Sequence, residues 1–457
     1  MVGDSDDTRG AAAACADAGL SAARPGIRDA QTAAVLGALS PTARRIVKAA
    51  FRVLERDGYE GLSLRRIAQE AGETKSLITY HFENKAGLVT TLVDSLWHDA
   101  DVSLAAEAES LAADPRGRLL ALTGLHRRLA QDARLYQTYF DLFPHILRDG
   151  EARARLTRTY RSYRHIGELC LAQGSADGNA LSLATLLLAI GEGIAVQVLM
   201  TGDGGVLKPA FAVLERRVLC HLGLEPAAEP PRAPVAQPVP GSPSDAADPS
   251  AGFLEGMEDP AARLTPAAAR VLDAAVALAS DEGLRAVTAE SLARVSGEPS
   301  SSVLYYFGDK RGLIASVVAA SDYRFAQAVT KAAGRVASYR PAPAALAGVV
   351  QRVFQQPGWM RLFYDVLPVV LRDDDLRARE AVFMERLRSE PTALLCRAGI
   401  DEDESSQLAL LSQSLVFGLA VQKLVDPRGT PVSAAVEAWQ ALLEQRPVGP
   451  REPSGKA

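Results

Sequence analysis

The chain contains little cysteine and no cysteine motif. Its four cysteines, Cys15, Cys170, Cys220 and Cys396, lie far apart among 457 residues, with no Cys-x-x-Cys pair and no Cys/His spacing that could hold zinc. This pattern excludes a disulfide framework and a zinc module. Such sparse usage of cysteine suits a reducing cytosol.

Aromatic residues are also scarce. They make up 6% of the chain, whereas hydrophobic residues as a whole make up 48%, with Ala and Leu prominent and few runs of β-branched residues. Ala and Leu favour helices, and β-branched and aromatic residues favour strands. The composition therefore predicts an all-α fold in which helices pack on helices.

Neither sign of charge is in large excess. Fifty Lys and Arg against 55 Asp and Glu give a formal net charge of -5, so the chain lacks the overall basic character that marks many nucleic-acid-binding proteins. Any basic surface must be local. The sequence yields no Ser/His/Asp set, no paired carboxylates and no metal-ligand spacing, so we expect no enzymatic activity, cofactor or metal.

Long apolar runs are absent as well. No uncharged apolar stretch reaches the ~18 residues of a membrane span, and the best candidate, residues 180–190, stops just before Glu192. The N-terminus carries three aspartates among its first seven residues and has no apolar h-region, so it does not resemble a signal peptide. These features predict a soluble cytoplasmic protein.

Proline is concentrated in one segment. Residues 225–260 contain nine prolines and very few apolar side chains, a composition that forms an extended, semi-rigid linker. It divides the chain almost in half. Residues 1–38, rich in Ala, Gly and Asp, and residues 446–457 are predicted to be disordered.

The two sides of this linker repeat each other. At a constant offset of 225 residues, 49 consecutive positions align without a gap, and matches at offsets of 224 and 225 return in two segments downstream. The matched residues of the first copy include Pro41, Gly58, Gly72, Tyr80, Phe82, Lys85, Asp141, Pro144, Arg148, Asp149, Gly193 and Gln197. Three matching segments in the same order indicate that a unit of about 185 residues is duplicated.

Each copy begins with three predicted helices. In the first copy, Ser40 and Pro41 form a helix start, and an apolar i, i+3, i+4, i+7 stripe follows until a stop near Gly58. Ser63 caps a shorter helix that Gly72 ends, and a third helix runs from residue 73 or 74 to about residue 82. Two helices joined by a Gly-containing turn are typical of a helix-turn-helix, whose second helix enters the DNA major groove.

These segments resemble a known family. The strings SLRRIAQEAGETKSLITYHFENKAGL in the first copy and TAESLARVSGEPSSSVLYYFGDKRGL in the second are similar to the characteristic sequence of the tetracycline-repressor (TetR) family of bacterial regulators. The resemblance implies a three-helix DNA-binding head followed by a helical body that binds a small effector and dimerises. The implied domains are a first head at 39–97, a first body at 98–224, a linker at 225–262, a second head at 263–322 and a second body at 323–445.

The resemblance places the third helix of each head in the groove. Lys and Ser can contact base edges or phosphates, and Tyr hydroxyls usually contact phosphates. The DNA-binding candidates of the first head are Ser63, Arg65, Thr74, Lys75, Ser76, Thr79, Tyr80, His81 and Lys85. Those of the second head are Thr288, Ser300, Ser301, Tyr305, Tyr306 and Lys310. An ordinary solvated helix face is the alternative interpretation.

The two predicted heads differ in charge. Residues 40–88 carry nine basic and six acidic side chains, a net charge of +3, whereas residues 265–313 carry five basic and six acidic side chains, a net charge of -1. Ser300 stands at the position of Lys75. Because phosphate neutralisation supplies most non-specific affinity, we expect the second head to contribute less binding or to read a different half-site.

In both predicted bodies, aromatic residues gather near a proline. Aromatics at helical spacing more often belong to a core than to a pocket, although effector cavities are commonly built between such helices. The ligand-binding candidates are Tyr136, Tyr139, Phe140, Phe143, Glu192, Trp359, Phe363 and Tyr364. Glu192 either is buried, where it could meet a cationic ligand or Arg161, or lies on a partly exposed face.

Together these features predict a transcriptional regulator that binds a double-stranded DNA operator, with repression relieved by a small-molecule effector as the expected mode. Two fused heads and bodies would form a single-chain pseudo-dimer that reads two unlike half-sites. A homodimer of chains is the alternative assembly. The competing hypothesis is a ligand sensor or protein-interaction scaffold in which one or both heads no longer bind DNA.

Overall fold

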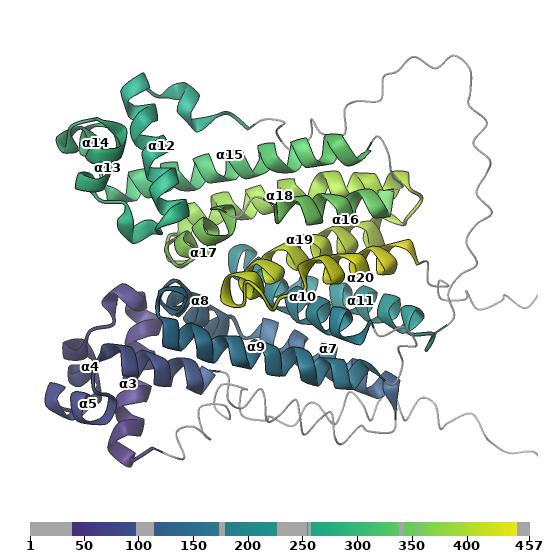
Figure 1. The fold of residues 1–457 in the computed structure, drawn as a ribbon, viewed down its shortest axis with the longest axis horizontal. Helices are drawn as coiled ribbons and strands as arrows, with labels where there is room; N and C mark the ends of the chain where they lie inside the picture. Colours follow the sequence, from purple (N-terminus) through teal and green to yellow (C-terminus); the bar gives the residue numbers. More distant parts are fainter. Residues whose placement is uncertain are drawn as a thin grey trace, which may run out of the picture.

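The protein is described by a computed structural model that covers residues 39–96, 114–172, 179–225, 254, 257–337, 342–355 and 358–445. The predicted disordered arm and tail, and the larger part of the predicted linker, lie outside these residues. All regular elements within the described residues are helices, which confirms the predicted all-α fold. Figure 1 shows the two three-helix heads at one end of the molecule and the helices of the two bodies side by side behind them.

The order of the helices is the same in the two copies. The helices of the first copy that lie wholly within the described residues are α3 (Pro41–Gly61), α4 (Leu64–Ala71), α5 (Lys75–Phe82), α7 (Pro115–Gln131), α8 (Ala133–Arg148), α9 (Gly150–Leu171), α10 (Ala180–Thr201) and α11 (Leu207–His221). Residues 85–96 are also helical. Those of the second copy are α12 (Pro266–Asp281), α13 (Ala289–Ser296), α14 (Ser300–Phe307), α15 (Lys310–Ala337), α16 (Ala342–Val353), α17 (Gly358–Val370), α18 (Asp374–Arg397), α19 (Glu402–Val425) and α20 (Val432–Glu444).

The helices of the first head begin and end where the sequence predicts. The Ser40 hydroxyl accepts a hydrogen bond from the Ala43 N–H at the start of α3 (3.2 Å), and Gly58, with φ of 67°, interrupts that helix. Ser63 caps α4, and Gly72 ends it with φ of 69°, a left-handed conformation that glycine adopts without strain. The predicted helix-turn-helix is therefore confirmed.

The second head repeats this construction with different capping residues. Thr265 caps α12 by accepting from the Ala268 N–H. Thr288 caps α13 through a capping box, in which the Ser291 hydroxyl in turn accepts from the Thr288 N–H at 2.9 Å. Gly297, with φ of 75°, ends α13 as Gly72 ends α4.

The two bodies meet along α10 and α19, which approach most closely at a pair of matched glycines. A Cβ on Gly193 would lie 1.8 Å from the carbonyl oxygen of Ser414, and a Cβ on Gly418 would lie 1.8 Å from that of Ala189. Ala189 and Ser414 are separated by the same 225 residues as the two glycines. The two contacts are therefore related by a pseudo-twofold axis, as in an isologous dimer interface.

A second reciprocal contact joins the halves close to the heads. Nη2 of Arg148 lies 2.7 Å from both carboxylate oxygens of Asp365, and Arg372 pairs with Asp141. These four residues are equivalent pairs at an offset of 224. Each Arg thus pairs with the Asp of the other copy, and the duplication seen in the sequence is also a symmetry of the structure.

Two of the helices, α10 and α19, are long and apolar enough to cross a membrane. Within the fold, 100% of the apolar window of α10 and 83% of that of α19 are buried. A core helix of a soluble protein passes the same test. Packing of the two helices against each other explains their composition.

Candidate nucleic-acid interface and body cavities

The third helix of the first head presents the predicted recognition residues to solvent. Thr74 caps α5 by accepting from the Leu77 N–H at 3.2 Å, and Ile78 and Phe82 fix the helix by burying their side chains. Tyr80 is 81% exposed. The exposed candidates on or next to this helix are Thr74, Lys75, Ser76, Thr79 and Tyr80. They form a continuous polar surface on a helix held by its apolar side.

Of the four further candidates of the first head, three have structural contacts and one is exposed. The Ser63 hydroxyl caps α4 by accepting from the Arg66 N–H, while Arg65 is exposed. His81 is half-buried and contacts the Tyr80 ring. Lys85 is also half-buried, because its Nζ lies 4.0 Å from the centre of the Tyr59 ring.

The position of Lys85 differs from that of Lys75. Burial lowers the pKa of the Lys85 ammonium group, and the Arg285 guanidinium adds to the shift. The Tyr59 ring attracts the ammonium through a cation–π contact. Lys85 therefore lies against Tyr59, whose ring stacks on His145 of the body.

The third helix of the second head is exposed in the same way but carries less charge. Ser300, Ser301 and Lys310 are exposed, and Tyr305 is 84% exposed. Tyr306 is half-buried against the rings of Tyr305 and Phe307. Apart from Thr288, which caps α13, the candidates again lie on or next to one short helix.

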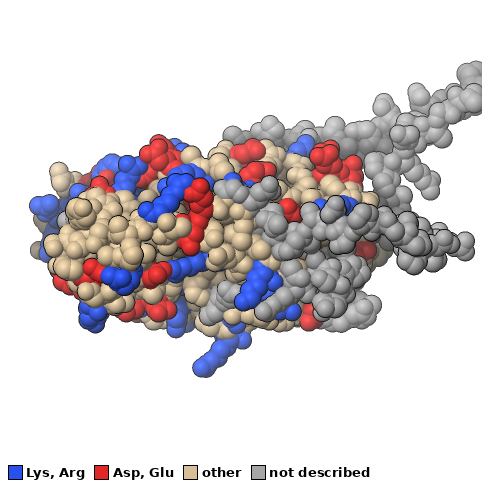
Figure 2. All heavy atoms as spheres, turned by 90° about the horizontal axis from the view of Figure 1, so that it is seen from above, with Lys and Arg blue, Asp and Glu red and all other residues tan. Residues whose placement is uncertain are grey.

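Several cations of the heads already have partners. Arg45 pairs with Glu73 in the first head, and their equivalents Arg270 and Glu298 pair in the second. Figure 2, which shows the molecule from above Figure 1, has Lys and Arg interspersed with Asp and Glu on the visible face. No large area of one charge is visible on that face.

The aromatic candidates of the bodies divide into core residues and cavity residues. Tyr139, Phe140 and Phe143 from α8 and Tyr364 from α17 are fully buried. The Phe140 and Tyr364 rings stack across the two copies with centroids 5.6 Å apart. These four side chains form a joint core of the two bodies, and none of them lines any of the cavities described next.

An apolar cavity lies between α15, α16, α18 and α19 of the second body. Its volume is about 90 Å³, and its mostly apolar wall also includes Ser412, Gln413, Glu390 and Arg397. A neighbouring cavity of about 40 Å³ is lined by the candidates Trp359 and Phe363. The two cavities share Phe325 and Phe417 in their walls.

Glu192 lies inside the first body, next to a cavity of about 20 Å³ that Tyr136 also lines. Its side chain is 2% exposed, and one of its oxygens accepts a hydrogen bond from the Tyr160 hydroxyl. Burial raises the pKa of the carboxyl group to about 8. Arg161 pairs with Asp426 instead. The structure thus excludes a partly exposed position and an ion pair with Arg161.

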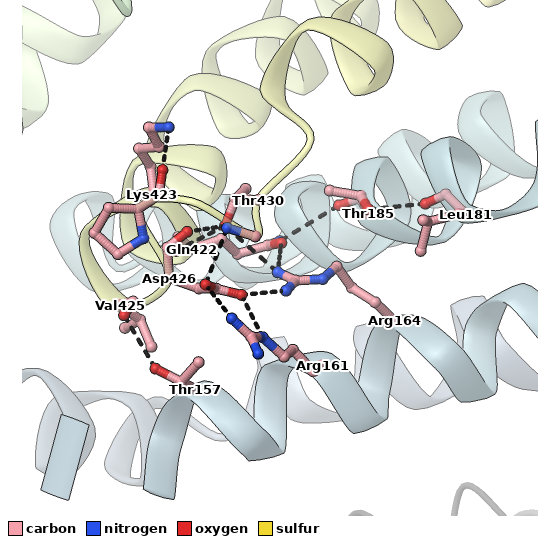
Figure 3. A network of polar contacts seen from close by, with 12 residues as sticks. Thr157, Arg161, Arg164, Leu181, Thr185, Gln422, Lys423, Val425, Asp426 and Thr430 are labelled. Carbon is pink, nitrogen blue, oxygen red and sulfur yellow. Dashed lines mark hydrogen bonds and ion pairs between the residues drawn. The ribbon is translucent and has the colours of Figure 1, made fainter. Parts of the chain in front are cut away.

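Sequence analysis missed a charged network between the two bodies. Asp426, at the end of α19, accepts hydrogen bonds from Arg161 (2.8 and 2.9 Å) and from Arg164 (2.8 Å) on α9. Figure 3 shows the carboxylate between the two guanidinium groups. Hydrogen bonding by Arg161, followed by that of Arg164, holds the pKa of Asp426 at about 2.

The matched glutamines Gln197 and Gln422 belong to the same interface. The Gln422 side-chain oxygen lies 3.3 Å from Nη1 of Arg164, and the Gln197 oxygen lies 3.4 Å from Nη1 of Arg388. The sequence match identified both positions without assigning a role. Their side chains both accept and donate hydrogen bonds across the two halves, which only a long-range pairing could have revealed.

No group of three or more His, Cys, Asp or Glu side chains that could hold a metal ion occurs among the described residues. The cysteines that the structure describes, Cys170, Cys220 and Cys396, are not in disulfides. The chemistry of the sites described above is that of hydrogen bonding, ion pairing and apolar packing.

Comparison with known proteins identifies the two heads. The family described as "Bacterial regulatory proteins, tetR family" matches residues 46–92 and again residues 271–317. These two ranges include the helix-turn-helix of each copy.

Three curated regulators are similar to parts of the chain. The HTH-type transcriptional regulator TtgR of Pseudomonas putida is 39% identical over 95 residues, which are 20% of this chain and 45% of that protein. The probable HTH-type transcriptional regulator ArpR of the same species is 42% identical over 69 residues, 15% of this chain and 32% of that protein. The HTH-type transcriptional regulator BetI of Rhizobium meliloti is 26% identical over 175 residues, 38% of this chain and 84% of that protein.

The chain thus matches less than half the length of the first two relatives and most of the third. The family matches in both heads agree with the internal repeat and with the reciprocal contacts between the copies. Each half of the chain therefore carries a domain that matches the tetR family of bacterial regulatory proteins, and the two copies stand in tandem.

Proposed function

We propose that this protein is a cytoplasmic transcriptional repressor that binds an operator as a single-chain pseudo-dimer and is released from it by a small-molecule effector. The observation that carries the proposal is the exposed polar surface of α5, with Lys75 and Tyr80, on a helix-turn-helix of the tetR family. Such a helix can enter the major groove, where its side chains reach base edges and phosphates. The domain limits are those given in the sequence analysis.

Pairing of the two copies within one chain is supported by the reciprocal contacts. The Gly193–Ser414 and Gly418–Ala189 approaches have the geometry that two identical subunits make in a symmetric dimer. A duplicated chain supplies both sides of such an interface. Both heads then lie at one end of the molecule, as Figure 1 shows, and can face the same DNA duplex.

The contacts of Arg372 connect one body to the opposite head. Its guanidinium donates hydrogen bonds to the carbonyl oxygens of Leu54 (3.0 Å) and Glu55 (3.2 Å) in α3 and also pairs with Asp141. On the other side, Asp365 pairs with Arg148 and accepts from the Leu284 N–H of the second head. A shift of one body against the other would therefore move both heads.

The apolar cavity of the second body is the best candidate for the effector site. An apolar or amphipathic molecule could fill it and place a polar group near Ser412 or Gln413. Both residues lie on α19, the helix that packs on α10 of the first body. An effector that binds one arrangement of the bodies more tightly than the other would change the spacing of the heads.

Selection of bound fragments from random duplex DNA tests the proposal. The full chain should enrich a site with two unlike half-sites, and footprinting should show protection of both. A thermal-shift screen of apolar compounds, followed by repetition of the selection with each hit, should identify an effector that reduces the enrichment. Recovery of no sequence above background would contradict DNA recognition.

The second head favours a variant of this proposal. Its net charge of -1 over residues 265–313 agrees with a head that binds DNA weakly or serves as a folded module in a sensor or scaffold. Protection of a single half-site in the footprint would support that variant. Protection of two half-sites would support DNA binding by both heads.

A further inference from the structure

Three charged contacts break the symmetry of the interface between the halves. The first is the network of Arg161, Arg164 and Asp426 (Figure 3). The side chains of Arg164 and Asp426 are 4% and 3% exposed. The residue equivalent to Asp426 in the first copy, at the offset of 225, is Thr201, which bears no charge. The first half therefore contributes the cations of this network and lacks the anion.

The second contact involves Arg217 on α11, whose side chain is 1% exposed. Its guanidinium lies 3.0 Å from a carboxylate oxygen of Glu404 and donates to the carbonyl oxygen of Leu442 at 2.8 Å. Leu442 is the residue equivalent to Arg217, and Asn179 is equivalent to Glu404. Arg217 thus lies beside its equivalent residue, Leu442, close to the pseudo-twofold axis. The carboxylate that pairs with Arg217 again belongs to the second half.

The third contact joins the heads. Glu60 and Arg285 are equivalent residues at the offset of 225, and they form an ion pair with each other. In a symmetric dimer, equivalent residues that meet at the axis are identical and carry the same charge. Both side chains are largely exposed, so the pair itself adds little stability. Its significance is that the charges of the two copies are opposite.

From these contacts we infer that the interface is selective for unlike halves: the first half pairs with the second half and rejects a second copy of itself. This inference builds on the internal pairing proposed above. In a pair of first halves, Arg164 and Arg217 would each be buried without a carboxylate, and Arg217 would face another Arg217. Glu60 would face Glu60. A single-copy relative with the charges of the first half would be rejected for the same reason.

The buried positions dominate the selectivity. Removing one partner of a buried ion pair leaves an uncompensated charge, which is strongly unfavourable. Two such positions occur per half, so a pair of first halves should be at least about 100-fold less abundant than the unlike pair. A combination of unlike heads on the DNA would follow, because a pair of first halves would be rare.

The test uses the full chain with a protease site inserted into the proline-rich segment. The folded protein is cut, unfolded in urea and refolded, and native mass spectrometry counts the complexes. We expect one first half with one second half, and at least about 100-fold fewer pairs of first halves. A statistical mixture, in which about half of the pairs are alike, would overturn the inference, as would separation into single halves.

A variant of the intact chain gives an independent test that does not depend on refolding. The substitutions D426T and E404N give the second half the uncharged residues of the first. They should lower the urea midpoint clearly, whereas Thr201→Asn, at the position equivalent to Asp426, should leave it nearly unchanged. An unchanged midpoint for D426T/E404N would also overturn the inference. If the intact chain instead proved to be a two-chain dimer with first halves paired, the internal pairing itself would be wrong.

Discussion

At the two buried charged contacts that break the symmetry of the interface, the first half contributes the cations and the second half contributes the carboxylates. Arg161, Arg164 and Arg217 come from the first copy, while Asp426 and Glu404 come from the second. The backbone contacts, in contrast, are reciprocal, as the approaches at Gly193 and Gly418 show. The comparison teaches that a duplicated chain can keep a symmetric framework while its side chains become specialised for one another.

The heads differ in the same manner. Both have an exposed third helix and the same Arg–Glu ion pair, Arg45–Glu73 and Arg270–Glu298. The first adds Lys75, where the second has Ser300. Because phosphate contacts set most of the affinity, equal geometry does not imply equal binding. The following predictions test which of the differences between the halves have functional weight.

The largest effect is expected from Asp426→Asn. The substitution leaves the buried Arg164 without its carboxylate, and the expected loss of unfolding free energy is about 3–5 kcal/mol. Urea denaturation measures the loss. The matched control, Thr201→Asn in the first half, should cost less than about 1 kcal/mol. Similar losses for the two variants would mean that the halves are equivalent at this position.

Glu192 should make stability depend on pH. Its folded pKa of about 8 exceeds the unfolded value of about 4.3, so the folded state holds a proton that the unfolded state releases over this interval. The unfolding free energy should therefore fall as pH rises from about 4.5 to 8 and then level off. Glu192→Gln should remove this dependence and be more stable than the wild type at pH 9 by on the order of 5 kcal/mol.

The second body offers a comparison for this effect. Burial raises the pKa of Glu380 to about 7. Its contribution to the pH dependence of the unfolding free energy therefore has the same sign as that of Glu192 and ends at a lower pH. Asp322 shares this buried site and its pKa is raised as well, so Glu380→Gln should flatten only part of the pH dependence that the pair contributes. A stability curve that is unchanged in Glu192→Gln would show that the carboxyl group is hydrated in solution.

The matched glycines should respond alike. Gly193→Ala and Gly418→Ala each place a methyl group against a backbone carbonyl of the opposite helix, and overpacking of this kind costs about 1–3 kcal/mol. Thermal or urea unfolding should give equal losses for the two. Gly204→Ala, which meets nothing within 4 Å, is the control. A loss confined to one glycine would break the structural symmetry of the halves.

Local sequence signals were enough to predict the heads. Ser40, Ser63 and Gly72 act through neighbours three or four residues away, so capping and turn preferences identify them. The duplication was visible because both copies kept residues such as Gly193 and Gly418. Whether the candidate residues contact DNA or a ligand stays a prediction.

The interface could not be predicted in the same way. The partners Arg164 and Asp426 are 262 residues apart, and no periodicity connects them. Arg161 was a plausible partner for Glu192 because both residues belong to one body. In the structure, Arg161 instead forms an ion pair with Asp426 of the other half. Contacts between side chains across the pseudo-twofold axis can be predicted only when the position of the axis is known. The repeat indicates that such an axis exists but does not give its position.

The smallest effect concerns DNA binding by the two third helices. Lys75 is exposed at the start of α5, so Lys75→Ala should lower affinity by about tenfold or less and reduce the salt slope by about 1. Ser300→Ala, at the equivalent position, should leave the slope unchanged because no charge is lost. Lys310→Ala should also reduce the slope less than Lys75→Ala. Fluorescence anisotropy of a selected operator between about 50 and 200 mM salt measures the slopes. Lys85→Ala separates two roles of that lysine. A reduced salt slope would show that its ammonium group leaves the Tyr59 ring and contacts a phosphate. A reduced stability with an unchanged salt slope would show that the ammonium group remains at the Tyr59 ring. Equal slope changes for Lys75→Ala and Lys310→Ala would contradict the unequal roles of the two heads.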